Sequence, residues 1–226
     1  MKIGVISAMQ KEHAQIVQLL QQATAIDGTF PLVSGRLGDN ELVLEQCGIG
    51  KVNAAVGAAE LIRRMEVDCV VSTGVAGGAD SSLSVMDVVV ANRLVHHDFN
   101  IGMGYARGEI QGMPRFFPAD EKLVSAALAL GDPTVRAGLI CTGDQFVSAA
   151  EDLAAIKQYF PNALAVDMES AAIAQTCYIY GVPFVSFRII SDTPGADKHV
   201  QQYENFWTDM AEKSFELTRK FLLSIK

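Results

Sequence analysis

Short apolar runs alternate along the chain with longer amphipathic stretches, and this alternation limits the fold more than any other feature of the sequence. The short runs have the length and β-branched content of buried strands, whereas the longer stretches repeat apolar residues at helical spacing. Such alternation is typical of a layered α/β domain. The predicted strands span Ile3–Ser7, Phe30–Leu37, Glu41–Cys47, Asp68–Thr73, Met86–Val95, Arg136–Cys141, Leu164–Val166 and Pro183–Ile190. The predicted helices span Gln10–Gln22, Lys51–Met65, Glu121–Leu130, Glu151–Tyr159, Met168–Tyr180 and about Tyr203–Leu223.

One predicted pair of strands breaks the simple β-α order. Gly38, Asp39 and Asn40 separate two strand-like runs, and these residue types tolerate the positive φ of a tight turn, which predicts a β-hairpin. A hairpin inside an alternating pattern indicates a mixed sheet with helices on both faces. A length of 226 residues suits one large domain, and we expect residues 1–226 to form it.

Charge and cysteine content restrict the class of protein. The net charge of −8 leaves no basic face to neutralise phosphates, so nucleic acid is not an expected partner. The N-terminal apolar run is too short to span a bilayer, and it predicts a first strand, neither a signal peptide nor a membrane anchor. Four widely spaced cysteines in apolar surroundings indicate buried thiols in a reducing compartment, and we expect a cytoplasmic protein: Cys47, Cys69, Cys141 and Cys177.

Acidic residues fall where predicted strands end, which is where open α/β sheets bind ligands. Glu12 follows the first strand, Asp167 and Glu169 bracket a strand-to-helix junction, and Asp192 follows an apolar strand that contains Arg188. Any one such acid, taken alone, is more often a helix cap or a solvated loop charge. Several together favour a site, but their periodicity does not distinguish one α/β enzyme from another.

Other motifs argue mainly against familiar chemistries. The run Gly74–Gly78 lacks the spacing of a dinucleotide or phosphate loop, so it predicts either a tight bend or close backbone approach to a flat or sugar-like ligand. His96 and His97 are adjacent on a strand and point to opposite faces, so they do not chelate one ion. No G-x-S-x-G elbow is present. We therefore expect no metal and no organic cofactor.

Seven ordered segments carry a resemblance to a known family. They are KIGVISAMQKE at 2–12, CGIGKVNAA at 47–55, STGVAGG at 72–78, HHD at 96–98, TGDQFV at 142–147, AVDMESAAIA at 165–174 and FRIISD at 187–192. Together these segments resemble the bacterial 5′-methylthioadenosine/S-adenosylhomocysteine nucleosidases, which have the purine nucleoside phosphorylase/uridine phosphorylase fold. The resemblance implies a three-layer α/β/α sandwich around a mixed central sheet, and hydrolysis of an adenine nucleoside to adenine and a thioribose product.

The resemblance also implies a role for each catalytic position. Asp192 would protonate N7 of adenine, with Ser191 orienting it. Glu12 would position and deprotonate the attacking water. Glu169 would bind the ribose 2′- and 3′-hydroxyls, and Arg188 would lie beside that water and carboxylate. Such a reaction needs a better leaving group and a stabilised oxocarbenium-like sugar, and two acids in different environments can supply both. Burial beside apolar residues is expected to raise the pKa of Asp192.

The implied substrate contacts surround these acids. Phe146 would stack on adenine while the backbone of Val147 reads its polar edge. Ile101 would reach across a homodimer interface into the neighbour's pocket. The remaining implied contacts, several of them around the sugar and the 5′-thioalkyl group, are Met9, Ile49, Val75, Ala76, Gly77, Asp167, Met168 and Phe206.

The sequence departs from some family members and leaves alternatives open. Val75 replaces a serine found in certain members, Asp167 stands where glutamate is frequent, and the loop Gly102–Pro118 aligns poorly. Related phosphorylases carry a Gly-Asp-Pro-x-Arg segment where this chain has Ala8–Glu12, and a carboxylate there repels phosphate, so hydrolysis is favoured. The alternatives are a 6-amino-6-deoxyfutalosine nucleosidase, a purine nucleoside phosphorylase, and a non-catalytic nucleoside sensor.

Overall fold

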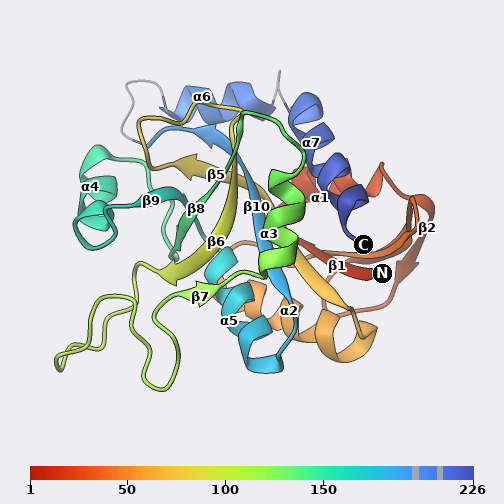
Figure 1. The fold of residues 1–226 in the computed structure, drawn as a ribbon, viewed down its shortest axis with the longest axis horizontal. Coiled ribbons are helices and arrows are strands. Elements are labelled where there is room, and N and C mark those ends of the chain that lie inside the picture. Colours follow the sequence, from red (N-terminus) through yellow and green to blue (C-terminus); the bar gives the residue numbers. More distant parts are fainter. Residues whose placement is uncertain (195–198, 208–210) are drawn as a thin grey trace.

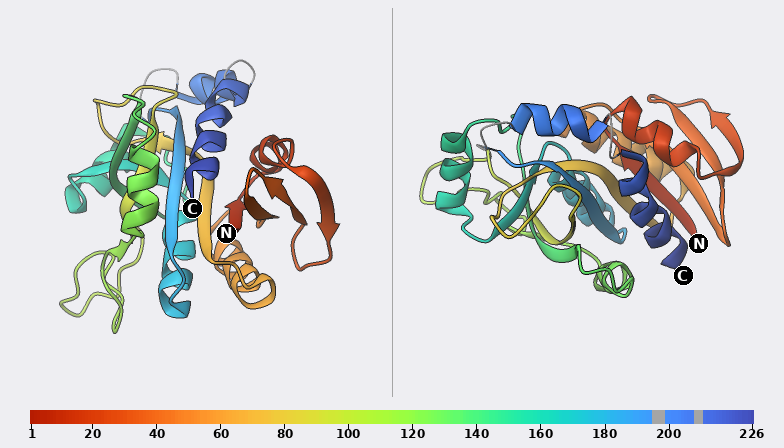
Figure 2. Two further views of the ribbon diagram at one scale, coloured as in Figure 1. Left: turned by 45° about the vertical axis from the view of Figure 1, so that its right-hand side comes forward. Right: turned by 90° about the horizontal axis from the view of Figure 1, so that it is seen from above.

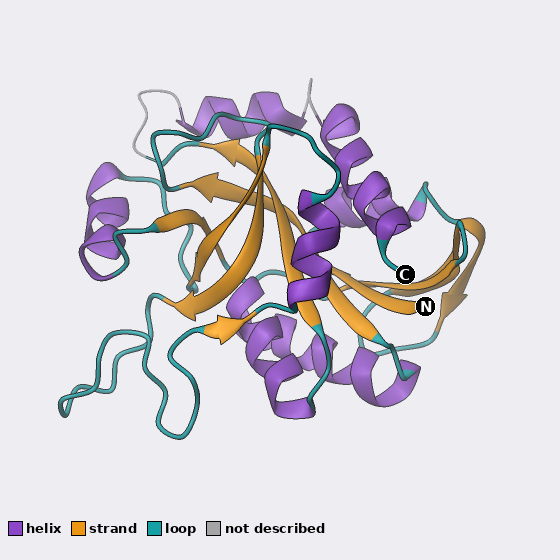
Figure 3. Ribbon diagram, in the orientation of Figure 1, coloured by secondary structure: helices purple, strands orange, loops and turns teal. Residues whose placement is uncertain are grey.

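The computed structural model describes residues 1–194, 199–207 and 211–226 (Figures 1 and 3). The strands are β1 (Lys2–Ser7), β2 (Gln21–Ile26), β3 (Leu32–Leu37), β4 (Asn40–Gln46), β5 (Cys69–Gly78), β6 (Val88–His96), β7 (Phe117–Pro118), β8 (Val135–Thr142), β9 (Ala163–Asp167) and β10 (Phe184–Asp192). The helices are α1 (Gln10–Val17), α2 (Lys51–Met65), α3 (Glu121–Leu128), α4 (Ala150–Tyr159), α5 (Ser170–Tyr180), α6 (His199–Asn205) and α7 (Ala211–Ser224).

All of these strands belong to one mixed sheet, in the order β10-β6-β8-β9-β5-β1-β4-β3-β2, with β7 paired to β6. The predicted hairpin is present, because β3 and β4 pair in antiparallel fashion up to Leu37 and Asn40. β10 also pairs with β5 in parallel, which closes β5, β10, β6, β8 and β9 into a ring. This closure brings the ends of β5, β9 and β10 together around one space.

Helices cover both faces of the sheet, so the predicted three-layer α/β/α fold is confirmed (Figure 2). On one face, Leu61 of α2 and Ile173 of α5 pack against sheet residues such as Ile6. On the other face, Ile16 of α1 and Phe221 of α7 complete a second core that also includes α3. No helix within the described ranges is both long and apolar enough to cross a membrane.

Three predicted boundaries were wrong. The first helix ends at Val17 instead of Gln22, and Gln21–Ile26 forms an edge strand whose exposed side chains gave no apolar alternation. The segment Gly74–Gly78 continues β5 instead of bending away, since its glycines let neighbouring side chains approach the strand. The single C-terminal helix is two helices, α6 and α7, and part of the predicted span, 208–210, lies outside the described residues.

Candidate active site

A pocket opens where β1, β5, β9 and β10 end, so residues distant in sequence share one wall. Its lining is mostly apolar with a few convergent carboxylates, a composition typical of small-molecule sites. The lining residues are Ala8, Met9, Glu12, Ile49, Val75, Ala76, Gly77, Gln145, Phe146, Val147, Val166, Asp167, Met168, Glu169, Ser191, Asp192 and Tyr203. All the candidate site residues predicted from sequence are in this wall except Ile101, Arg188 and Phe206.

The three exceptions lie elsewhere for different reasons. Arg188 is 1% exposed and stands directly behind the pocket carboxylates. Phe206 is fully buried in the core on the face of α1 and α7, packed edge-on against Trp207, so it does not form the pocket wall. Ile101 is exposed on the loop that follows β6 and is not among the residues that line this pocket.

Tyr203 in α6 is a pocket residue that the sequence reasoning missed. Its hydroxyl donates to Met9 Sδ at 3.4 Å, and its ring meets Phe146 edge-on at a centroid distance of 5.8 Å. From the helical spacing of apolar residues, Tyr203 was predicted only to lie at the start of a helix. It reaches the pocket because α6 packs against β10, and this tertiary contact cannot be predicted from a local sequence pattern.

Glu12 is buried and held by three backbone N–H groups. Its Oε2 accepts from Ala8 at 3.1 Å and from Met9 at 2.9 Å, while its Oε1 accepts from Val75 at 3.0 Å. Glu12 therefore caps α1, as the simpler interpretation held, and also reaches across to β5. Burial raises the pKa of Glu12, and the charge of Arg188 together with these N–H groups opposes that rise.

Gly74 separates Glu12 from Arg188. Its φ of +143° lies in the region that favours glycine. A Cβ at this position would overlap both Oε1 of Glu12 and Nη1 of Arg188, so the missing side chain lets the two charged groups face the same space. The two groups form no direct ion pair within 4.0 Å in the described structure.

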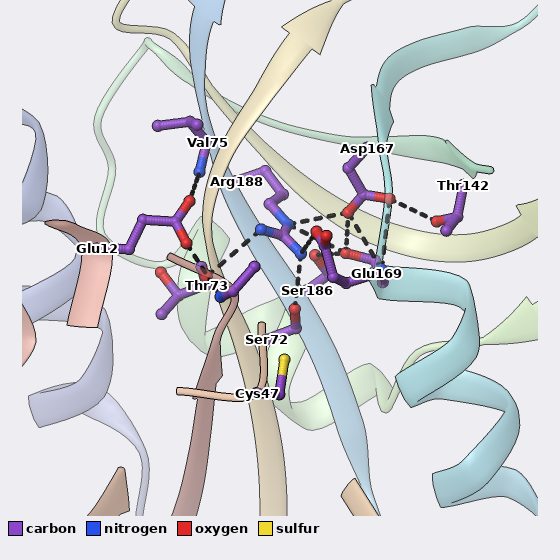
Figure 4. A network of polar contacts seen from close by, with 12 residues as sticks. Glu12, Cys47, Ser72, Thr73, Val75, Thr142, Asp167, Glu169, Ser186 and Arg188 are labelled. Carbon is purple, nitrogen blue, oxygen red and sulfur yellow. Dashed lines mark hydrogen bonds and ion pairs between the residues drawn. The ribbon is translucent and has the colours of Figure 1, made fainter. Parts of the chain in front are cut away.

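Arg188 and Glu169 form a buried pair. Arg188 Nη2 lies 3.5 Å from Glu169 Oε2, and Glu169 Oε1 accepts from the Gly50 N–H at 3.0 Å (Figure 4). Burial raises the pKa of Glu169 to about 7, against the opposing charge of Arg188. Burial acts to lower the pKa of Arg188, but the charges of Asp167 and Glu169 outweigh it and raise that pKa.

Both carboxylate oxygens of Asp167 bind other groups of the protein. Its Oδ1 accepts from Thr142 Oγ1 at 2.5 Å, and its Oδ2 contacts Arg188 Nε at 3.0 Å and the Ser170 hydroxyl. Both oxygens are engaged although the residue also borders the pocket. Asp167 is therefore better placed to hold Arg188 than to bind a ligand.

Asp192 ends β10 and is 3% exposed. The Ser191 hydroxyl donates to Asp192 Oδ1 at 2.7 Å, and both residues face the pocket. Asp192, at the end of β10, and Glu12, in the first turn of α1, therefore approach one cavity from different elements. Two carboxyl groups placed in different surroundings around one cavity can act as acid and base on a ligand between them.

Among the described residues, the structure has no group of three or more His, Cys, Asp and Glu side chains placed to hold a metal ion. All four cysteines are free and buried. Burial raises the pKa of the Cys47 thiol to about 12, so this thiol next to the site is not a ready nucleophile.

Comparison with known proteins identifies the family of this chain. The sequence profile of the phosphorylase superfamily matches residues 2–223. The chain is 39% identical to the 5′-methylthioadenosine/S-adenosylhomocysteine nucleosidase of Hydrogenovibrio crunogenus, with 100% of both chains covered. The structure superposes with a TM-score of 0.93 on the S-adenosylhomocysteine nucleosidase of Streptococcus pyogenes in complex with 5-methylthiotubericidin, at 36% identity, covering 100% of this chain and 98% of that one. The TM-score is 0.92 for the 5′-methylthioadenosine/S-adenosylhomocysteine nucleosidase of Colwellia psychrerythraea in complex with adenine, at 38% identity, covering 100% and 96%. The chain belongs to the phosphorylase superfamily.

Proposed function

We propose that this protein hydrolyses the N-glycosidic bond of 5′-methylthioadenosine and S-adenosylhomocysteine, releasing adenine and the thioribose product. The Hydrogenovibrio crunogenus relative carries both substrates in its name, and the similar Streptococcus pyogenes structure is named a nucleosidase of the second. The pocket suits such ligands, because it combines apolar walls for a base and a thioalkyl group with carboxylates that suit a ribose.

In the proposed reaction, Asp192 gives a proton to N7 of adenine, which makes the base a better leaving group. Ser191 orients that carboxyl group through its hydroxyl. Glu169 accepts hydrogen bonds from the ribose hydroxyls, and a negative charge near the sugar stabilises the oxocarbenium-like transition state. Water enters the space between Glu12 and Arg188, and Glu12 takes its proton as the oxygen attacks the anomeric carbon.

The hydrogen bonds that hold the Glu12 carboxylate are the observation that favours water over phosphate as the nucleophile. The N–H groups of Ala8 and Met9 at the start of α1, together with that of Val75, would make a good anion site. The Glu12 carboxylate already occupies all three donors. A phosphate dianion would therefore meet a fixed negative charge where a phosphorylase offers positive groups.

An adenine-release assay with and without phosphate tests the proposal. We expect release from 5′-methylthioadenosine and S-adenosylhomocysteine at a rate independent of phosphate. Release that requires phosphate, with formation of a sugar 1-phosphate, would identify a phosphorylase. Strong preference for 6-amino-6-deoxyfutalosine would assign a different 5′-substituent, and tight nucleoside binding without any release would assign a sensor.

We also propose that the working unit is a cytoplasmic homodimer. Val52 and Val56 on α2 and Ile179 on α5 are exposed, Val52 by 74%, and a groove between these helices is lined by Val52, Ile179 and Ile110. A contiguous apolar face of this kind is typical of a subunit interface. The proposal places Ile101 of one protomer at its neighbour's pocket. Light scattering that gave the mass of one chain, 24.3 kDa, would exclude the dimer.

A cluster of three charged residues joins the loops on one side of the pocket. Lys51 Nζ lies 2.7 Å from both Asp98 oxygens, and Asp98 Oδ2 accepts from the Asp144 N–H at 3.0 Å. The Lys51 N–H donates to Asp144 Oδ1 at 2.8 Å. The cluster thus links the turn before α2, which holds Glu169, to the loop that carries Phe146.

Replacing Lys51 with methionine is expected to raise KM for the nucleoside about fivefold and to change kcat by less than twofold. Partly exposed pairs contribute only about 0.5 to 1 kcal/mol, so loosening the two loops weakens binding more than chemistry. Steady-state kinetics at low and high salt measures the effect, and the wild-type KM is expected to rise with salt. Lys2→Met, which removes an exposed pair with Glu41, is the matched control. An unchanged KM would show that the loops hold their positions without the cluster.

A further inference from the structure

The hydroxyls of Ser72, Ser170 and Ser186 lie near the Arg188 guanidinium, two of them in direct contact with it and the third through Ser170; Figure 4 labels Ser72 and Ser186. Ser72 Oγ of β5 accepts from Nη2 at 3.0 Å, and Ser170 Oγ of α5 accepts from Nε at 3.1 Å. Ser186 Oγ of β10 lies 2.7 Å from Ser170 Oγ. All three serines are fully buried, and none of them lines the pocket.

We propose that Ser72, Ser170 and Ser186, together with Asp167, are positioning residues that fix the Arg188 guanidinium in the orientation that presents Nη1 to the water site beside Glu12. The four residues are called the hydroxyl cradle below. The inference rests on the proposed hydrolysis, because it assigns the cradle an effect on the group that faces the attacking water.

The hydrogen bonds of the guanidinium define one orientation. Nε is shared between Asp167 Oδ2 at 3.0 Å and the Ser170 hydroxyl, and Nη2 is shared between Ser72 and Glu169. Nη1 has a longer contact, 3.4 Å, with the Thr73 carbonyl. The planar fork of five donors cannot rotate without breaking several of these bonds together. The edge with the weakest protein contact is thus the edge that faces Gly74 and Glu12.

Neutral acceptors suit this task better than further acids. Arg188 already interacts with three carboxylates, those of Asp167, Glu169 and Glu12. A fourth carboxylate would add buried negative charge that one cation cannot balance, whereas a hydroxyl accepts a hydrogen bond without adding charge. The three serines therefore orient the guanidinium without adding negative charge beside the carboxylates that Arg188 already faces.

Ser170 also connects Asp167 to Arg188. Ser170 lies three residues after Asp167 at the first turn of α5, and its hydroxyl contacts both the Asp167 carboxylate and Arg188 Nε. The hydroxyl thus gives Asp167 a second, indirect contact with Arg188 Nε beside the direct one at 3.0 Å. Thr142 holds the other oxygen of Asp167, so the acid cannot rotate away from Arg188.

The first test is Ser72→Ala, which removes one acceptor of Arg188 and leaves a small apolar side chain in β5. We expect kcat for adenine release to fall about tenfold while KM changes less than twofold. The cation would then sit less firmly beside Glu12 and Glu169, whose pKa values it lowers, so the acidic limb of the kcat–pH profile is expected to move to higher pH. Ser186→Ala, which touches Arg188 only through Ser170, should give a smaller change in the same direction.

The matched control is Thr176→Val, which removes another buried hydroxyl of α5 that bonds only to the Ala172 carbonyl of its own helix. It should leave both kcat and the pH profile unchanged. A rescue pair adds a second test. Ser170→Ala should lose activity, and Asp167→Glu added to it should restore part of kcat, because the longer acid can fill the space of the lost hydroxyl.

A measurement that does not depend on turnover tests the cradle independently of the proposed reaction. The Arg188 Nε–H signal in ¹⁵N NMR spectra, assigned by its absence in Arg188→Lys, should exchange with solvent at least tenfold faster in Ser72→Ala than in wild type. Equal exchange, or a kcat–pH profile of Ser72→Ala that superposes on wild type, would overturn the cradle. An inactive wild type with slow exchange would instead refute only the hydrolysis.

Discussion

Replacing Asp192 with asparagine is expected to lower kcat for adenine release by about 10³-fold while the nucleoside still binds. General acid catalysis typically contributes about 10²- to 10⁴-fold, and an amide cannot release a proton to the leaving base. Asparagine keeps the size of the side chain and can still accept the Ser191 hydrogen bond, so the pocket should keep its shape. Single-turnover kinetics measures the chemical step, and calorimetry with the intact nucleoside measures binding to the variant.

Two further variants sharpen this prediction. Ser191→Ala leaves the acid in place and removes only the hydroxyl that orients it, so we expect a loss of about tenfold. Asp39→Asn changes an exposed aspartate in the β3–β4 turn and should leave kcat unaltered. If Asp192→Asn released adenine at the wild-type rate, another group would protonate the base, and the assignment of the acid would be abandoned.

The sequence carried enough information to predict the strands that build the site. Strong apolar periodicity predicted β1, β4 and β10, and these strands deliver Glu12, the turn at Ile49 and Asp192 to the pocket. Their positions follow from the general rule that acids at strand ends gather at a sheet edge. The family resemblance then gave each acid a role that periodicity alone could not supply.

The features that escaped prediction depend on contacts distant in sequence. β2 is an exposed edge strand whose residues, Gln21–Ile26, have no apolar alternation. The pairing of β10 with β5 closes the ring, and it sets Arg188 beside Gly74 across a sequence separation that no local pattern records. The three cradle serines read as ordinary strand and helix residues, because only the fold brings their hydroxyls to one guanidinium. Phe206 and Tyr203 both occur near the start of the last predicted helix, and only packing shows which one faces the pocket.

A buried carboxyl group outside the site gives the second prediction. Glu45 of β4 is fully buried, and neither of its carboxyl oxygens has a hydrogen-bond partner among the described residues. It faces α2 at Gly57, where a Cβ would overlap Oε1. Burial, with a smaller contribution from the charge of Glu60, raises the pKa of Glu45 from 4.5 to about 8.

This shift makes the free energy of unfolding depend on pH in a defined direction. Below about pH 4.5 both the folded and the unfolded chain hold the proton on Glu45. As the pH rises from there to about 8, the unfolded chain ionises Glu45 while the folded chain must keep it protonated, so stability falls across this window. Above about pH 8 both states are ionised and the loss levels off.

Glu45→Leu is therefore expected to stabilise the protein, and more strongly at pH 8 than at pH 5. The difference between the two pH values should be about 3 kcal/mol, since one pKa unit corresponds to about 1.4 kcal/mol. Urea unfolding of both proteins across this range measures it. Glu41→Leu, an exposed position on the same strand, is the control and should show no such pH-dependent gain.

A stability difference between Glu45→Leu and wild type that stayed constant from pH 5 to pH 8 would contradict this prediction. It would mean that the folded protein carries Glu45 ionised, with a counter-charge or water reaching it inside the core. The unpartnered acid would then have to be reassigned as a buried ion.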